Sequence, residues 1–235
     1  MCAASTTGIA PGATANELPH RGIRPRARSL AIVYGLTFGA LAVAALMSAY
    51  NGVPIAFVLR DPLATLKAHP LTGVLSNVGV LVWCAAAAIC FYTRTILRHE
   101  EGTDEMRSFL AWSGLISSVL LLDDFFQFHD GLVPMYLGKG EDPIFLGYGL
   151  VTAWWLVRFR RLILVTEWVV LFTGLTFFAL SMFVDAFQEQ WASPWRILFE
   201  DGFKLLGIVS WSSYLIRTCA HAAAARARTA ASPGL

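Results

Sequence analysis

Charged residues are scarce in this chain, at 14% of its 235 residues, whereas hydrophobic residues make up 56%. A soluble domain of this size carries about a quarter charged residues. The net charge is also small, at +2, which does not indicate a nucleic acid or another polyanionic partner. Together these features exclude a soluble enzyme, a nucleic-acid binder and a disordered protein, and they predict an integral membrane protein.

Cysteine motifs are likewise absent. The chain has four cysteines, at Cys2, Cys84, Cys90 and Cys219, and no Cys-x-x-Cys or Cys/His metal-binding spacing. Neither a disulfide framework nor a zinc knuckle is therefore predicted.

Long apolar stretches, by contrast, are abundant. Several of them approach or exceed the roughly 18–20 residues that a bilayer-spanning helix requires. We predict about six spans, in chain order 30–50, 72–92, 108–129, 143–157, 162–185 and 194–216. The fourth is short for a span, so tilt or burial by its neighbours is expected there. The predicted fold class is all-α, a polytopic transmembrane helix bundle.

The six spans form one predicted domain at 29–217, flanked by disordered tails at 1–28 and 218–235. The N-terminal tail is small, polar and basic, and the C-terminal segment AHAAAARARTAASPGL is of low complexity. A secretory signal is the alternative for the first span. Its apolar run, however, exceeds the roughly 7–15 residues of such a signal.

The basic residues predict the orientation. If the N-terminus is cytoplasmic, thirteen of the 18 lysines and arginines fall in cytoplasmic segments and four fall outside, with Lys204 inside the sixth span. This regular alternation satisfies the positive-inside rule and predicts both termini in the cytoplasm. Arginine outnumbers lysine by 15 to three, as in GC-rich bacterial genomes, so the predicted location is a bacterial inner membrane.

Polar residues within the predicted spans are the candidates for function, because ionisable groups in a membrane usually face a bundle interior or a wet cavity. Three spans carry such residues at or near one end: Asp123, Asp124, Gln127 and His129; Ser181, Asp185 and Gln188; and Glu200, Asp201 and Lys204. At a helical rise of about 1.5 Å per residue these groups lie at similar depths. We therefore predict one polar pocket that opens toward the outer face.

Five acids in this pocket accompany a single lysine. The acids are Asp123, Asp124, Asp185, Glu200 and Asp201. Helical spacing places Lys204 within reach of Glu200 and Asp201 on its own helix. One lysine cannot neutralise five carboxylates, and like charges at low dielectric either bind cations or take up protons. The five acids are therefore predicted to have a function.

A divalent-cation site is the first functional hypothesis. Carboxylates and amide oxygens suit Mg²⁺, Ca²⁺ or Mn²⁺, and a histidine would extend the choice to Fe or Zn. The predicted ligands are Asp123, Asp124, His129, Asp185, Glu200 and Asp201, with His129 included only if the third helix unwinds before Gly131. Such an ion could activate water to hydrolyse a lipid or another apolar small molecule, with Asp123, Asp124 and Lys204 as catalytic groups.

Two alternatives from other classes stay open, so the sequence does not decide whether the protein is an enzyme. A proton- or cation-coupled transporter would use paired carboxylates and a lysine in the membrane. It would also need a polar path to the cytoplasmic side, and the inner halves of the spans are apolar. An accessory or scaffold protein would instead use the acids in buried ion pairs with partner subunits or with a second copy.

Five tryptophans, at Trp154, Trp155, Trp191, Trp195 and Trp211, are predicted to lie mostly near the membrane interfaces, as aromatic belts do. Glu167, beside Trp168, is predicted to be interfacial as well.

At LLDDFFQFHDG and FEDGFKLLGI the chain resembles a group of uncharacterised bacterial multi-pass membrane proteins. That group carries an LDD-x-F-x-x-H-D/E stretch and a later acidic-Gly-x-Lys-x-x-Gly-Ile stretch; the resemblance covers the third to sixth spans and implies no activity. The chain is also faintly similar to alkaline-ceramidase-type membrane hydrolases, which hold zinc with an Asp on one helix, a Ser-x-x-x-His and a late His-x-x-x-His. The Asp-bearing helix has a counterpart here but both histidine motifs are missing, so no ligand is carried over.

Overall fold

The computed structural model describes residues 27–128, 142–186 and 194–231, and no strand occurs in these ranges. The predicted all-α class is therefore confirmed. The chain divides into two compact units, Met1–Thr72 and Gly73–Leu235. The predicted domain at 29–217 extends over both.

The first unit contains one long helix and two short ones: α1 (Ala27–Asn51), α2 (Ile55–Leu59) and α3 (Pro62–Leu66). A tight turn follows α1, in which the Ser48 hydroxyl donates to the Val53 carbonyl at 2.7 Å. Asp61 begins α3 as its N-cap, and its carboxylate accepts the Ala64 N–H at 2.9 Å. A side-chain oxygen at this position satisfies a backbone donor that the helix itself cannot.

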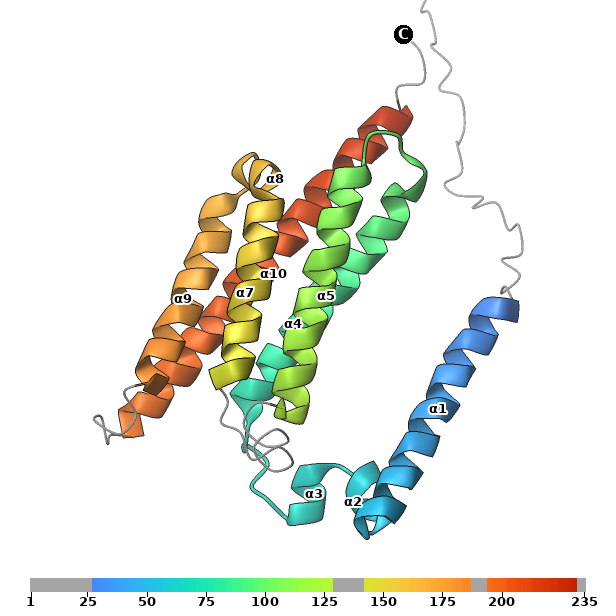
Figure 1. The fold of residues 1–235 in the computed structure, drawn as a ribbon, viewed down its shortest axis with the longest axis vertical. Coiled ribbons are helices and arrows are strands. Elements are labelled where there is room, and N and C mark those ends of the chain that lie inside the picture. Colours follow the sequence, from blue (N-terminus) through green and yellow to red (C-terminus); the bar gives the residue numbers. More distant parts are fainter. Residues whose placement is uncertain (1–26, 129–141, 187–193, 232–235) are drawn as a thin grey trace, which may run out of the picture. The chain divides into compact units, whose positions relative to one another are not determined.

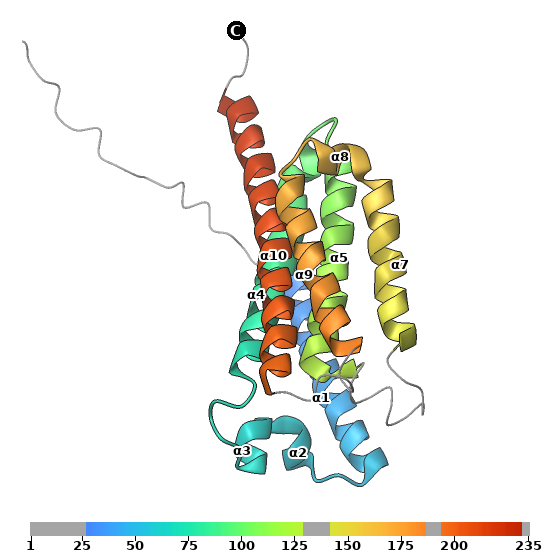
Figure 2. The same cartoon turned by 90° about the vertical axis from the view of Figure 1, so that its left-hand side faces the viewer.

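The second unit is a bundle of long helices (Figures 1 and 2). Its elements are α4 (Val74–Ile96), the 3₁₀ helix η1 (Leu97–His99), α5 (Asp104–Phe126), α7 (Asp142–Arg158), α8 (Arg160–Leu164), α9 (Trp168–Ala186) and α10 (Pro194–Ala231). Helix α10 packs against both α9 and α4, and α4 packs against α5. Helix α7 runs beside α5 with far fewer contacts. The short α8 joins α7 to α9 at one end of the bundle.

Within the described ranges, α4, α5 and α9 are long and apolar enough to cross a membrane. They coincide with the second, third and fifth predicted spans. Only 22% to 39% of the apolar stretch of each is buried inside the protein, so most of this apolar surface faces outward. A soluble protein rarely exposes so large an apolar surface, whereas lipid tails cover it readily. The chain is thus a membrane protein.

The third predicted span ends earlier than expected. The prediction was a helix at 108–129, but α5 ends at Phe126 and Gln127 adopts a left-handed conformation with a φ of 51°. Its backbone N–H donates to the Asp123 carbonyl, as is usual for a residue that closes a helix. Gln127 therefore does not continue the helical face that carries Asp123.

The fifth predicted span, 162–185, is interrupted near its start. The structure places a short break between α8 and α9. In this break the Thr166 hydroxyl donates to the Ile163 carbonyl at 2.8 Å and lies 2.9 Å from the Tyr214 hydroxyl of α10. A threonine hydroxyl bonded to a backbone carbonyl competes with the helical hydrogen bond, which accounts for the break.

The predicted disordered tail at 218–235 is wrong for most of its length, because α10 continues through Ala231. The segment is rich in alanine, the strongest helix former. It is also attached to the rest of the bundle: Cys219 is buried with its sulfur 3.9 Å from that of Cys90, and Arg226 forms a salt bridge of 2.9 Å with Glu100. Residues 232–235 lie outside the described ranges.

Aromatic rings fill the centre of the bundle. The fully buried ones include Phe109, Trp155, Phe159, Trp211 and Tyr214. The rings of Trp155 and Trp211 pack with centroids 5.2 Å apart and face the core of the bundle, not the lipid; their depth in the membrane stays a prediction. Trp154 and Trp195 are exposed, and Trp191 lies outside the described ranges. The centre of the bundle is thus closed by apolar and aromatic packing.

Glycines allow α9 and α10 to approach closely. A Cβ on Gly174 would lie 3.0 Å from the backbone nitrogen of Trp211, and a Cβ on Gly207 would lie 2.7 Å from the Phe178 ring. Small residues at such crossings let the backbones of membrane helices come together. This close packing fixes the position of the α10 segment that carries Glu200, Asp201 and Lys204.

Candidate functional site

Six of the predicted site residues lie at one end of the second unit, which we call the acidic end: Asp123, Asp124, Asp185, Glu200, Asp201 and Lys204. They lie near the last turns of α5 and α9 and in the first turns of α10. Antiparallel packing brings these helix ends together at the same end of the bundle (Figure 1). The polar residues of the three helices therefore lie at the same end of the bundle, as the sequence predicted.

Asp124 and Lys204 form the central contact of the acidic end. The Lys204 ammonium lies 2.7 Å from Asp124 Oδ1, and the Trp83 indole N–H donates to Asp124 Oδ2 at 3.2 Å. The Asp124 side chain is 10% exposed and that of Lys204 is 40% exposed. Helical spacing offered Lys204 the acids of its own helix, and the structure instead pairs it with Asp124 of the neighbouring α5. Trp83 was missed, because Arg94, the one charged residue of α4, lies about three turns away from it.

A small cavity adjoins this ion pair. Its volume is about 50 Å³, and it is lined by Leu75, Ser76, Gly79, Asp124, Asp201, Lys204, Leu205 and Ile208. Asp201 thus faces the same space as the pair, three residues before Lys204 on α10. Two carboxylates and one ammonium give the cavity a formal charge of −1.

Asp123 points elsewhere, although it is the neighbour of Asp124. It is 4% exposed, and its carboxylate accepts a hydrogen bond from the Tyr148 hydroxyl of α7. Consecutive helical residues are turned by about 100°, so two adjacent acids reach two different helices. The sequence analysis missed Tyr148. The signal available was a tyrosine within a short apolar span, since a buried tyrosine hydroxyl usually finds a partner.

Glu200 connects α10 to α9. Its backbone carbonyl accepts the Ser181 hydroxyl at 2.9 Å, and its carboxylate pairs with Arg196 one turn earlier on α10. Glu200 also interacts electrostatically with Asp185 and Asp201. Glu200 is therefore close enough to both acids to be repelled by them, and Arg196 binds its carboxylate.

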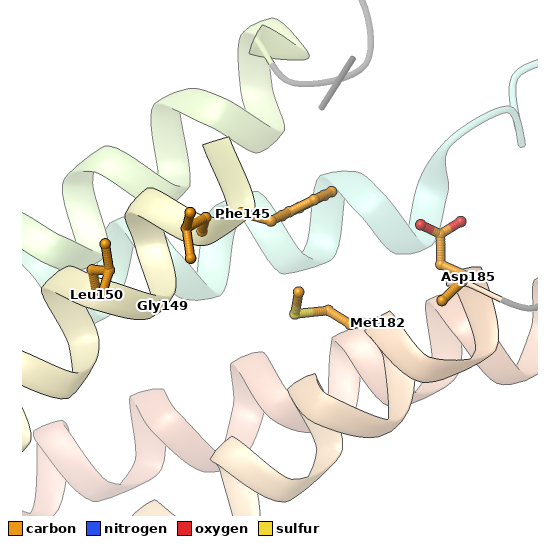
Figure 3. Close-up of a pocket in the computed structure, with 7 residues that line it drawn as sticks. Phe145, Gly149, Leu150, Met182 and Asp185 are labelled. Carbon is orange, nitrogen blue, oxygen red and sulfur yellow. The ribbon is translucent and has the colours of Figure 1, made fainter. Parts of the chain in front are cut away.

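Asp185 lies at the end of a larger groove between α7 and α9 (Figure 3). The groove has a volume of about 460 Å³ and is lined by Phe145, Leu146, Gly149, Leu150, Met182, Asp185 and Ala186. Among the described lining residues, Asp185 is the one that is ionisable. The groove was not predicted, since it depends on how α7 packs.

The predicted metal ligands do not form a metal site within the described part of the chain. No group of three or more His, Cys, Asp or Glu residues there is arranged to hold a metal ion. His129 and Gln188 lie outside the described ranges, so a site that includes them stays a prediction.

At the opposite end of the bundle lies a cluster that we call the paired end, made of Glu100, Glu167, Arg217, His221 and Arg226. Glu167 accepts two hydrogen bonds from Arg217, at 2.5 and 2.8 Å, and lies 3.4 Å from His221. The hydrogen bonds from Arg217 lower the pKa of Glu167 below its usual value. Each acid of the paired end thus has an arginine partner.

Comparison with known proteins gives one match. The family described as Domain of unknown function (DUF8692) matches residues 33–218. No curated protein and no solved structure matches the chain. The matched range includes every residue of the acidic end and most of the chain. This protein therefore belongs to the DUF8692 family.

Proposed function

We propose that this protein binds one small monovalent cation (Na⁺, K⁺ or a proton) in the cavity between Asp124 and Asp201. One observation carries the proposal: two carboxylates and one ammonium line the same small cavity. Their formal charges leave an excess of −1, so one monovalent cation neutralises the site. Asp201 is exposed, so a soluble ion can reach the cavity, and a negative excess beside the nearly buried Asp124 favours a bound counter-ion.

The size of the cavity suits an ion better than a larger substrate. A volume of about 50 Å³ accommodates one or two water molecules or one cation, since a water occupies roughly 30 Å³ of liquid. Sites for organic ligands are typically about 300–1,000 Å³. The predicted hydrolysis by Asp123, Asp124 and Lys204 would need room for a scissile bond beside these groups. It therefore has less support than cation binding.

In this proposal the Lys204 ammonium occupies the cation site of Asp124 and moves away when Na⁺ or K⁺ binds there. Its ammonium contacts Asp124, and the 40% exposure of its side chain leaves it room to turn. Asp201 lies on the same face of α10 and lines the same cavity. A cation bound to Asp124 would displace Lys204 toward Asp201, so that both acids stay neutralised. Trp83 would hold the other Asp124 oxygen in place throughout.

A divalent cation is the second candidate, favoured by the electrostatic contacts of Glu200 with Asp185 and Asp201. Together with a ligand from outside the described ranges, two of these acids could hold Mg²⁺, Ca²⁺ or Mn²⁺, and His129 as that ligand would extend the choice to Fe or Zn. The ion would then sit between α9 and α10 rather than beside Lys204. The two candidate sites therefore differ in the residues whose substitution should abolish ion binding.

The proposed setting is a bacterial inner membrane, crossed six times with both termini in the cytoplasm. Helices α1, α7 and α10 would supply the three further spans, since they cover the first, fourth and sixth predicted ranges. The excess of arginine and lysine in the inner segments supports this orientation. The acidic end would then face the outside and exchange its cation with that side. Reporter fusions at both termini test the topology, and an outward signal from either end would contradict it.

Thermal unfolding of the purified full chain in detergent tests cation binding. A ligand that binds only the folded state raises stability by RT ln(1 + [L]/Kd), about 2.7 kcal/mol at 100 Kd. We expect the melting temperature to rise saturably with Na⁺ or K⁺, or on acidification if the ion is a proton, and not with choline at equal ionic strength. Asp124→Asn and Asp201→Asn should abolish the rise. Glu167→Gln, at the paired end, is the matched control and should keep it.

Other outcomes separate the alternatives. A response to a divalent ion, with stoichiometric metal by elemental mass spectrometry that Asp185→Asn and Glu200→Gln remove, would replace the monovalent site by the divalent one. An equal response to choline, or one that persists in Asp124→Asn and Asp201→Asn, would overturn the proposal. The acids would then be structural, as expected of an accessory subunit.

A further inference from the structure

The groove between α7 and α9 has the size and lining of a binding site for an organic molecule. Its volume of about 460 Å³ falls within the range of about 300–1,000 Å³ that is usual for such sites. Apart from Asp185 its lining is apolar, with Phe145, Gly149 and Leu150 on α7 and Met182 on α9 (Figure 3). A molecule with an extended apolar part therefore fits it.

Asp185 determines the charge of this molecule. It stands at one end of the groove and interacts electrostatically with Glu200, a second acid. No described lysine or arginine forms a salt bridge with Asp185, and the nearby Arg196 is paired with Glu200. A carboxylate beside an apolar surface is stabilised by a positive partner. Since the chain does not supply one among its described residues, we propose that the groove binds an amphiphilic cation, with its ammonium group on Asp185.

Two other lining residues suit such a ligand. Figure 3 shows the Phe145 ring extending along the groove toward the end where Asp185 lies. An aromatic face attracts an ammonium group by cation–π interaction. Met182 points from α9 into the space below α7, and a flexible thioether adapts to apolar groups of different shape.

The groove is accessible from the bilayer side. Leu146, Leu150 and Met182 are all at least half exposed on the surface of the bundle, where lipid surrounds the protein. An amphiphile concentrates at the membrane interface with its charged group outward. It would therefore reach Asp185, in the last turn of α9, without crossing the packed centre of the bundle.

This site is independent of the cation proposed at Asp124, since the two cavities share no lining residue. Glycine substitutions offer a matched pair on α7. A Cβ on Gly149 or on Gly147 would meet no atom within 4 Å, so either position accepts a larger side chain. Only Gly149 lines the groove. Gly149→Leu therefore fills the groove, whereas Gly147→Leu leaves it open.

The test is equilibrium binding of radiolabelled dodecyltrimethylammonium to the full chain in nanodiscs, with empty nanodiscs as the background. We expect saturable binding by the wild type. Asp185→Asn should weaken it roughly tenfold, as the loss of a charged contact does, and Gly149→Leu should weaken it at least as much. Gly147→Leu and Asp124→Asn should bind like the wild type. The normal response of Asp124→Asn separates this site from the cation site.

Three results would overturn the proposal. They are wild-type binding no greater than that of empty nanodiscs, unchanged binding by Asp185→Asn, and unchanged binding by Gly149→Leu. Competition by neutral dodecanol as strong as that by unlabelled dodecyltrimethylammonium would also overturn it, because the groove would then recognise an apolar chain and not a cation. Circular dichroism of each variant ensures that a loss is measured on folded protein.

Discussion

The two ends of the bundle differ in how their acidic residues are paired with basic ones. At the paired end each acid has its own arginine: Glu100 with Arg226 and Glu167 with Arg217. At the acidic end five acids lie near only two described bases, Lys204 and Arg196. The two acids of the paired end are each matched by an arginine, whereas the described residues of the acidic end keep a negative excess. That excess supports the proposal that the acidic end binds a ligand.

The tightness of packing also differs between the middle of the bundle and its acidic end. Near the middle of the bundle, Gly174 and Gly207 stand in close contact with the neighbouring helix, whereas a Cβ on Gly202 at the acidic end would meet no atom within 4 Å. Both cavities also lie at the acidic end. The end with unbalanced charge is thus also the end with free space, which a binding site requires.

The largest effect on stability is expected from a substitution at the close contact between α9 and α10. Gly174→Leu would force a side chain against the Trp211 backbone, where even a Cβ would lie at 3.0 Å. We expect it to destabilise the protein by about 3 kcal/mol or to prevent folding, since overpacking typically costs about 1–3 kcal/mol when only side chains must move. Thermal unfolding in detergent measures the loss.

Gly202→Leu is the matched substitution at the acidic end. Leucine favours a helix by nearly 1 kcal/mol over glycine, and position 202 has room for it. This variant should therefore unfold at the same temperature as the wild type or slightly above it. Equal destabilisation by the two leucines would contradict the contrast in packing between the two regions.

The next effect concerns the ion pair at the acidic end. Lys204→Met would leave Asp124, which is 10% exposed, with the Trp83 indole but without the ammonium. Asp124→Leu would remove the acceptor of both groups. We expect each change to cost about 1–3 kcal/mol, below the range for fully buried pairs because Lys204 is partly exposed.

A double-mutant cycle isolates the pair. Asp124→Leu combined with Lys204→Met should cost less than the two single changes added together, by about 1 kcal/mol or more. The same cycle with Glu167→Gln and Arg217→Met at the paired end should give a smaller coupling, because those side chains are more exposed. Additive losses at Asp124 and Lys204 would mean that their contact contributes nothing.

Much of the fold follows from hydrophobic runs and helical rise, which place the acids of three helices at one end. The sequence could not predict which acid Lys204 would contact. Helical spacing offers Glu200 and Asp201 on its own helix, and the choice of Asp124 depends on how α5 packs against α10. Contacts of this kind between helices depend on tertiary packing, and the periodicity of one helix does not determine which other helix it packs against.

The same reason explains the residues that the sequence analysis missed. Trp83 and Tyr148 lie in apolar stretches, and only the packed bundle brings their N–H and O–H groups to Asp124 and Asp123. The continuation of α10 past residue 217 was, by contrast, within reach of the sequence. Its alanines favour a helix, and this preference outweighs the low complexity of the segment, which had indicated disorder.

The smallest expected effect is at the paired end and depends on pH. Arg217 lowers the pKa of Glu167 in the folded protein from its usual 4.5. The ion pair therefore adds stability above about pH 4.5 and loses it as the pH falls through the lower folded value. Between about pH 8 and pH 5 the melting temperatures of the wild type and Glu167→Gln should run parallel. Below about pH 4.5 the wild type should lose its small advantage, and coinciding curves throughout would show that Glu167 adds no stability. Because exposed ion pairs contribute little, the separation between the two curves should be small at every pH.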